Sequence, residues 1–265
     1  MGQQAVTFSN LLKRPKISVK KILSLGWQTY YDYLCKHDAG FRPLYSWWMP
    51  QQQKSITNKN DRRMEKRRNF KEALSNRRSY YGLSDKSPIS DVEIKEIIEY
   101  AVKHVPSAFN SQSTRIVLLL GRQHKKLWDI VKEALRGIVP PEAFGKTETK
   151  IDRSFSSGYG TVLFFEDQTV VEQLQRDNPL YSKNFSEWSQ HTSAMHQLAV
   201  WTMLEDAGFG ASLQHYNPLI DDAVCREWNI SKSWSLIAQM PFGMSTGDAG
   251  EKTFRPVEER VLVFE

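Results

Sequence analysis

Short apolar runs alternate with segments of helical periodicity along residues 69–265, and this alternation constrains the fold more than any other feature. A capping pattern, Ser90-Asp91 followed by Glu93, precedes apolar residues at helical spacing and predicts that a helix begins there. The apolar runs 115–120 and 160–165 have the length of buried strands. Because these elements do not follow a regular βαβ repeat, we expect an α+β fold.

Further segments show the same two periodicities. The predicted helices cover residues 70–74, 124–135, 168–175 and 189–207, and the further predicted strands cover 236–240 and 261–264. In the longest predicted helix, Met195, Leu198 and Met203 fall on one face. Gly208 follows directly and is suited to ending that helix.

Charge divides the chain into two parts. Residues 1–68 hold 14 Lys/Arg and 4 Asp/Glu, a balance of +10, whereas the remaining 22 Lys/Arg and 26 Asp/Glu give residues 69–265 a balance of −4. Residues 51–62 are polar without periodicity, which is typical of a linker. We therefore predict a basic N-terminal extension with its linker over 1–68 and a folded domain over 69–265.

The role of the extension has three interpretations. Its basic character, with no acidic residue before Asp32, is compatible with mitochondrial import, but its many bulky aromatic residues are unusual for a targeting peptide. Positive charge with interleaved aromatics also fits an arm for nucleic acid or an anionic membrane, although no recognised motif is present. An accessory tail of unknown role is the interpretation that we prefer.

Cysteines and histidines give no sign of a disulfide framework or a metal centre. Cys35 and Cys225 stand in unrelated contexts, so a reducing, cytoplasmic setting is expected. No Cys or carboxylate accompanies His191, His196 or His215 at ligand spacing, so no metal site is predicted. No apolar run approaches the ~18 residues of a membrane span. Four of the eight tryptophans, Trp188, Trp201, Trp228 and Trp234, are interpreted as core or interface residues.

Three polar clusters stand at the ends of predicted elements. The first is RRSYY at residues 77–81, where two guanidinium groups beside a hydroxyl suit a phosphate through charge-assisted hydrogen bonds. The second is PSAFNSQS at 106–113, whose amide side chains offer donors and acceptors to the edge of a heteroaromatic ring. The third, KTFR at 252–255, is another pair of cations. Taken singly, solvated surface charge and a capped turn explain the first two patterns better.

In this order the three clusters resemble the nitroreductase family of FMN-dependent oxidoreductases. The family pattern is an Arg-x-Ser motif, a Pro-Ser-x-x-Asn-x-Gln loop and a Lys/Arg cluster near the C-terminus. The strings NSQSTRIVLLLGRQHKKLWDIV, TVLFFEDQTVVEQLQ and AVWTMLEDAGFGASLQHYNP are similar to the compact branch of that family found in yeast and bacteria. The resemblance covers residues 69–265 and none of residues 1–68.

The resemblance implies a nitroreductase-like α+β fold, with a central, mostly antiparallel sheet flanked by helices and FMN at a homodimer interface. It assigns the phosphate and ribityl end of FMN to Arg77, Ser79, Lys252 and Arg255. It assigns the pyrimidine edge of the isoalloxazine ring to Asn110, with Gln112 and Ser113 nearby.

The resemblance also assigns backbone N–H groups of residues 213–216, which include Gln214 and His215, to flavin N5 and O4. These amides matter because reduction changes the charge of the ring system. Many larger members carry a Lys two residues beyond the Ser of the first motif, and here Tyr81 occupies that position. A phenol, Arg78 or a group of the partner chain is therefore expected near flavin N1.

The activity that the resemblance implies is an NAD(P)H-dependent flavin oxidoreductase. It transfers hydride in two steps, from NADH or NADPH to FMN and then to a nitroaromatic or quinone acceptor. No catalytic side chain is expected, because the cofactor carries the chemistry. Two alternatives stay open: a non-catalytic flavin-binding module with a regulatory or storage role, and a nucleic-acid- or membrane-associated protein that acts through residues 1–68. Neither specific nucleic-acid binding nor a membrane span is expected.

Overall fold

The protein is represented by a computed structural model that describes residues 69–265. The predicted basic extension and linker concern residues 1–68, which lie outside the described residues. The three interpretations of that extension, and the boundary at residue 69, therefore stay predictions.

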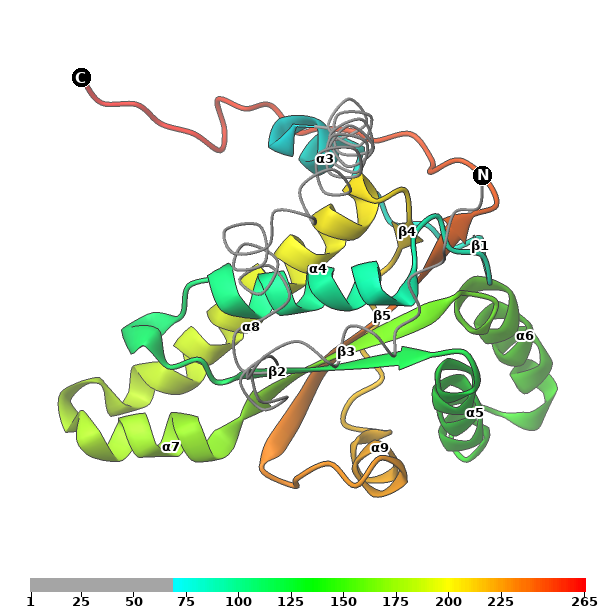
Figure 1. The fold of residues 1–265 in the computed structure, drawn as a ribbon, viewed down its shortest axis with the longest axis horizontal. Helices are drawn as coiled ribbons and strands as arrows, with labels where there is room; N and C mark the ends of the chain where they lie inside the picture. Colours follow the sequence, from blue (N-terminus) through cyan, green and yellow to red (C-terminus); the bar gives the residue numbers. More distant parts are fainter. Residues whose placement is uncertain (1–68) are drawn as a thin grey trace, which may run out of the picture. The chain divides into compact units, whose positions relative to one another are not determined.

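A five-stranded sheet forms the centre of the described domain (Figure 1). Its strand order is β1-β5-β3-β2, and β4 also pairs with β5. The strands are β1 (Leu83–Ser84), β2 (Thr114–Leu120), β3 (Gly160–Asp167), β4 (Gly210–Ala211) and β5 (Trp234–Ser245). All these strand pairs are antiparallel, which confirms the predicted α+β class with a mostly antiparallel sheet.

Strand β3 is buried on both of its faces. Val162, Leu163, Phe164 and Phe165 are each 0% exposed. Because successive strand residues point to opposite faces, Val162 and Phe164 enter one core cluster, whereas Leu163 and Phe165 enter the other. A strand covered on both sides needs a continuous apolar run, which is the pattern that the sequence shows here.

Helices cover both faces of the sheet (Figure 1). The described residues form α3 (Phe70–Asn76), α4 (Asp91–His104), α5 (Arg122–Arg136), α6 (Pro141–Ile151), α7 (Gln168–Asp177), α8 (Ser182–Asp206) and α9 (Asp221–Glu227). Helices α4 and α8 supply the first core cluster, and α5, α6 and α9 supply the second. No helix among residues 69–265 is long and apolar enough to cross a membrane.

The predicted start of α4 is confirmed by a complete capping box. The Ser90 hydroxyl accepts a hydrogen bond from the Glu93 N–H, and the Glu93 carboxylate accepts one from the Ser90 N–H. These bonds satisfy N–H groups that have no partner within the helix. The helix then buries Ile94, Ile98 and Ala101 against the sheet, as its periodicity predicts.

Helix α8 differs from its predicted form in length and in the character of its buried face. It begins at Ser182, seven residues before the predicted start. Its buried side chains include Ser189, Thr192, Ser193, His196 and Gln197. Met195 and Leu198, on the face that looked apolar in sequence, are instead 40% and 46% exposed. The buried face of α8 is therefore polar over residues 189–197, whereas Val200 and Leu204 join the apolar core. The exposed apolar side chains present a surface suited to contact with another molecule.

The predicted strand at residues 261–264 is wrong. These four apolar residues have no regular structure, and their side chains are 56–90% exposed. A strand needs a partner for its backbone groups, and residues 251–265 pair with no described strand. Helices α6 and α9 were not predicted, and β1 and β4 have only two residues each, too few for a periodic signal.

A buried histidine joins helix α5 to strand β3. The Thr161 hydroxyl accepts a hydrogen bond from Trp128 Nε1–H at 3.1 Å and donates to His124 Nδ1 at 2.8 Å. His124 Nε2–H donates to the Ser156 carbonyl at 3.2 Å, so the imidazole is neutral with its proton on Nε2. Burial lowers the pKa of His124 to about 4 from 6.5, and the positive charge of Lys125 acts in the same direction.

We predict that His124 makes the free energy of unfolding fall in mild acid. The unfolded chain binds a proton near pH 6.5, whereas the folded chain binds it only near pH 4, so stability is lost as the pH decreases through this range. Between pH 7 and pH 5 the loss attributable to His124 is about 2 kcal/mol. Urea unfolding of the wild type and of His124→Gln at both pH values measures it, and equal pH dependence in the two proteins would contradict the assignment.

Candidate functional site

The first predicted cluster, residues 77–81, lies along the outer side of β4. Ser79 forms a parallel bridge with Ala211, and the Tyr80 N–H donates to the Ala211 carbonyl at 2.9 Å. A Cβ atom at Gly210 would lie 3.0 Å from Tyr80 Cβ, so the absence of a side chain there allows the close approach. Ser79 is exposed, and Tyr81 is 54% exposed beside it.

The two arginines of this cluster make different contacts. The Arg77 guanidinium lies 4.4 Å from the centroid of the Trp201 ring of α8, a cation–π contact that leaves its N–H groups available to an anion. Arg78 Nη2 donates to the carbonyl of Gly250. The structure therefore brings the backbone that precedes the third cluster against the first cluster.

The side chains of the third cluster extend into solvent. Lys252 and Arg255 are exposed, and Lys252 Nζ lies 5.3 Å from the centroid of the Phe254 ring. Neither cation forms a salt bridge within residues 69–265. Both therefore remain available to an anion near Arg77, although the structure places neither side chain in contact with it.

Residues 213–216 run along the free edge of β5. The Gln214 N–H donates to the Gln239 carbonyl at 2.7 Å, and the Tyr216 N–H donates to Gln239 Oε1 at 2.8 Å. Backbone groups alternate in direction along an extended chain, so the amides of Leu213 and His215 point away from β5. Neither of these two amides donates to another residue of the described domain. This edge therefore offers two backbone donors next to the first cluster.

The second predicted cluster forms a loop with unusual backbone geometry. Phe109, Asn110 and Gln112 have φ values of 56°, 52° and 48°, in the left-handed region that residues other than glycine seldom adopt. The Asn110 N–H donates to the Ser107 carbonyl, and the Gln112 N–H donates to Ser107 Oγ, each at 3.0 Å. The side chains of Asn110 and Gln112 are exposed and bond to no described residue. Backbone strain of this kind concentrates at functional sites.

Ser113, also predicted to lie near the ring, has a buried side chain. Its hydroxyl donates to Glu166 Oε2 at 2.5 Å, and its side chain is 0% exposed. Burial raises the pKa of Glu166, whereas the hydrogen bonds from Ser113 and Thr114 act to lower it. Nearby, burial lowers the pKa of His196, whose Nδ1–H donates to the Thr192 carbonyl.

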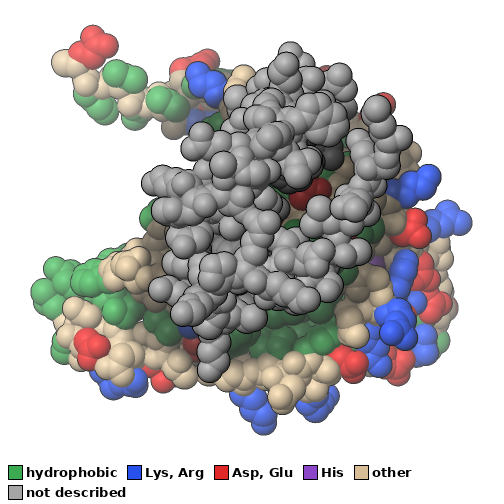
Figure 2. All heavy atoms as spheres, viewed as in Figure 1, with side chains coloured by type: hydrophobic (Ala, Val, Ile, Leu, Met, Phe, Trp, Pro, Cys, Tyr) green, Lys and Arg blue, Asp and Glu red, His purple; other side chains and the backbone are tan. Residues whose placement is uncertain are grey.

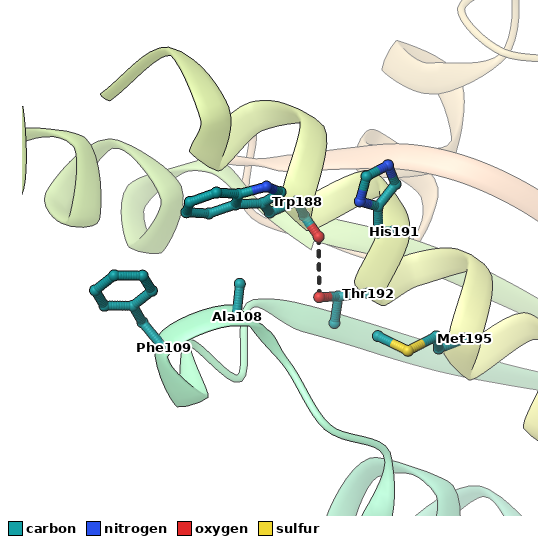
Figure 3. A pocket seen from close by; sticks show the side chains of 6 residues that line it. All are labelled: Ala108, Phe109, Trp188, His191, Thr192 and Met195. Atoms are coloured by element: carbon teal, nitrogen blue, oxygen red, sulfur yellow. Dashed lines mark hydrogen bonds between the residues drawn. The ribbon is translucent and has the colours of Figure 1, made fainter. Parts of the chain in front are cut away.

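A pocket of about 430 Å³ opens beside this loop (Figure 3). It is lined by Ala108, Phe109, Trp188, His191, Thr192 and Met195. The rings of Phe109 and Trp188 are nearly parallel, at an interplanar angle of 17° with centroids 6.1 Å apart. Aromatic walls with a few polar groups are typical of sites for small aromatic molecules. Trp188 was interpreted as core or interface, and no local signal distinguishes such a residue from a site residue.

Apolar side chains gather around the start of α8. Figure 2 shows hydrophobic atoms at the end of the domain where α7 meets α8, and mixed charges over α5 and α6. Leu180, Tyr181 and Phe109 in this region are 84%, 43% and 56% exposed. Met195, which lines the pocket with Phe109, and Leu198 are further exposed apolar residues of α8.

The structure separates the predicted site residues into two groups. Residues 77–79 and 213–215 lie outside β5, whereas the loop at 107–113 leads into β2, with β3 and β5 between them. From residues 213–215 the three strand spacings amount to about 14 Å, and residues 77–79 lie one strand farther out, beyond β4. The same separation appears on α8, because Arg77 contacts Trp201 and Phe109 contacts Trp188, thirteen residues or about 20 Å earlier along the helix.

Comparison with known proteins identifies the family of this chain. The family model described as the nitroreductase family matches residues 74–244. Nitroreductase FRM2 of Saccharomyces cerevisiae is 36% identical over 188 residues, which are 70% of this chain and 93% of FRM2. The structures of nitroreductase CinD from Lactococcus lactis in complex with chloramphenicol and with 4-nitrophenol are 42% and 43% identical, with TM-scores of 0.68 and 0.67. Each alignment covers 74% of this chain and 100% of CinD. The chain therefore belongs to the nitroreductase family of oxidoreductases.

Proposed function

We propose that the protein is a homodimeric FMN-dependent reductase, which takes hydride from NADH or NADPH and passes it to nitroaromatic or quinone acceptors. Residues 69–265 form the flavin-binding domain, and residues 1–68 form an extension with a separate role. The observation that carries the proposal is the separation of the two groups of site residues within one chain. We call residues 77–79 and 213–215 the first group, and the loop at 107–113 the second group. In a two-fold dimer, the first group of one protomer can meet the second group of its partner.

The first group suits the phosphate end of FMN. The Arg77 guanidinium contacts the Trp201 ring, and its N–H groups are available to a ligand. Ser79 adds an exposed hydroxyl. Arg78, Lys252 and Arg255 add positive charge around the same edge. Guanidinium groups bind phosphate through paired, charge-assisted hydrogen bonds, so this edge holds the anionic end of the cofactor.

The backbone of residues 213–215, which runs along β5, suits the flavin ring. The amides of Leu213 and His215 are the two donors that β5 leaves unused, because Gln214 and Tyr216 direct theirs toward Gln239. When bound, FMN supplies a centre that accepts a hydride from one substrate and donates it to the next. Fixed backbone donors stabilise negative charge that develops on such a ring without any reorganisation. Tyr81, half exposed beside this edge, stands where larger relatives carry a lysine.

The partner protomer completes the site with its second group. Asn110 and Gln112 of the partner subunit bring amide side chains to the edge of the ring, and the exposed apolar face of α8 provides surface for the dimer contact. The pocket between Phe109 and Trp188 then lies at this composite site and receives the acceptor. The CinD complexes with chloramphenicol and 4-nitrophenol support a nitroaromatic acceptor.

We predict that Arg77→Ala weakens FMN binding by about 1.5–3 kcal/mol, roughly 10- to 100-fold, because a charged hydrogen bond to the phosphate is lost. Titration of the flavin-free protein with FMN, followed by quenching of flavin fluorescence, measures this change. Arg226→Ala, which removes an exposed arginine from α9, is the matched control and leaves binding unchanged. Equal affinity in the Arg77 and Arg226 variants would remove Arg77 from the site.

Mixed dimers test whether two chains build each site. Arg77→Ala and Asn110→Ala are each expected to be impaired in FMN binding and in NADH-dependent quinone reduction. When the two variants are unfolded and refolded together in equal amounts, half of the dimers are mixed, and one site in each mixed dimer is intact. Activity should therefore return to about one quarter of the wild-type value. If each site lay within one chain, mixing would restore nothing.

A further inference from the structure

Glu166, at the end of β3, is a carboxylate buried at 0% exposure directly beneath the loop at 107–113. Its Oε2 accepts a hydrogen bond from the Ser113 hydroxyl, and its Oε1 accepts one from the Thr114 hydroxyl, both at 2.5 Å. No Lys, Arg or His within the described domain forms a salt bridge with it. Burying a carboxylate lowers the stability of the fold unless hydrogen bonds compensate for the lost hydration. The two short bonds from adjacent residues provide this compensation, and they also fix where those residues lie.

The two hydroxyls constrain the path of the backbone. Adjacent residues of a regular strand point to opposite faces, so one carboxylate reaches both Ser113 and Thr114 only if the chain turns between them. The pair of bonds therefore specifies the direction in which the loop leaves β2. Ser113 directly follows Gln112, the last residue of the loop with a positive φ, at 48°.

Other bonds from the same part of β3 hold the backbone of the loop. The Asp167 N–H donates to the Ser113 carbonyl at 2.9 Å. Arg115 Nη1 donates to the Gln112 carbonyl at 2.7 Å, while its Nη2 forms a salt bridge with Asp167 at 3.1 Å. Residues other than glycine keep a left-handed conformation only where several surrounding contacts hold them in it. The bonds from Asp167 and Arg115 are such contacts at one end of the loop.

The same group of bonds reaches the wall of the pocket. Thr114 Oγ1 lies 3.3 Å from Nδ1 of His196 on α8, and that nitrogen donates its proton to the carbonyl of Thr192. Thr192 lines the pocket, and its hydroxyl in turn donates to the carbonyl of Trp188 at 3.0 Å. Glu166 therefore links the loop that carries Asn110 to the helix that carries Trp188.

We propose that Glu166 is a positioning residue, which holds residues 109–112 in their left-handed conformation and so aligns Asn110 and Phe109 with the bound ring. This inference rests on the proposed function, in which the loop meets the flavin. The sequence motif of the loop does not include this carboxylate, which lies on another strand, β3. Asn110 acts on the ring, and Glu166 acts through Asn110.

Hydrogen exchange of the full-length, flavin-free protein tests the first half of the proposal. Thr114→Val keeps the shape of the side chain and removes one donor, and we expect the amides of Asn110 and Gln112 to exchange about tenfold faster or more. Thr149→Val makes the same change at an exposed position of α6 and leaves these amides unaffected. Glu166→Ala should increase exchange further, and Glu166→Gln, which still bonds to both hydroxyls, should restore it toward the wild-type rate. Unchanged exchange in Thr114→Val and Glu166→Ala would overturn the proposal.

A double-mutant cycle on FMN binding tests the second half. We expect Thr114→Val and Asn110→Ala each to weaken FMN binding about tenfold, and the double variant to be no weaker than the worse single variant. Additive losses would overturn the claim that the carboxylate acts through Asn110, as would faster exchange with unchanged FMN affinity. A wild-type protein that binds no FMN would refute the proposed function and, with it, the alignment of Asn110 with a bound ring. The exchange rates would then still report whether Glu166 holds the loop, so the two failures can be distinguished.

Discussion

The burial of β3 on both faces is the constraint on which the rest of the domain depends. Its continuous apolar run requires helices above and below the sheet, and its backbone requires a strand on either side. With β2 on one side and β5 on the other, the loop that enters β2 and the segment that runs along β5 cannot meet within one chain. The geometry that makes the core stable thus keeps the two groups of predicted site residues apart within one chain, and in the proposed dimer a second copy of the chain would bring them together.

Helix α8 contacts the core on one side and exposes apolar side chains on the other. Its inner face carries serine, threonine, histidine and glutamine side chains that bond to the helix backbone and to the polar group around Glu166. Its outer face carries apolar residues such as Met195 and Leu198, which an isolated domain would leave in water. On the proposed function, the outer face of α8 would form the dimer interface, while Trp188 and Thr192 line the pocket and His196 lies beside the hydrogen bonds of Glu166.

Local signals predicted local structure well. The capping box at Ser90, the apolar runs of β2 and β3 and the helical spacing of α5 all act over a few residues, and each was found where the sequence placed it. The run at 261–264 has the same local signal as a strand, but no strand within residues 69–265 pairs with it. Apolar composition is necessary for a buried strand and is not sufficient, because pairing depends on the rest of the fold.

The motifs of the candidate site could be predicted from the sequence, whereas their positions relative to one another in the folded chain could not. The three clusters can be read from the sequence in order, yet their spacing carries no information about which of them meet in one chain. Glu166 and Ser113 are 53 residues apart, and Trp188 differs in no local respect from a core tryptophan. Contacts of this kind depend on strand register and helix packing, and only the folded chain reveals them.

An anaerobic reductive titration of the purified full-length protein tests the central claim most directly. The account predicts a yellow protein whose visible absorption bleaches on addition of NADH or NADPH and returns on addition of 4-nitrophenol or a quinone. A protein that holds FMN but is bleached by neither donor would support a binding module without turnover and contradict the reductase assignment. A colourless protein that cannot be reconstituted with FMN would contradict the flavin site itself.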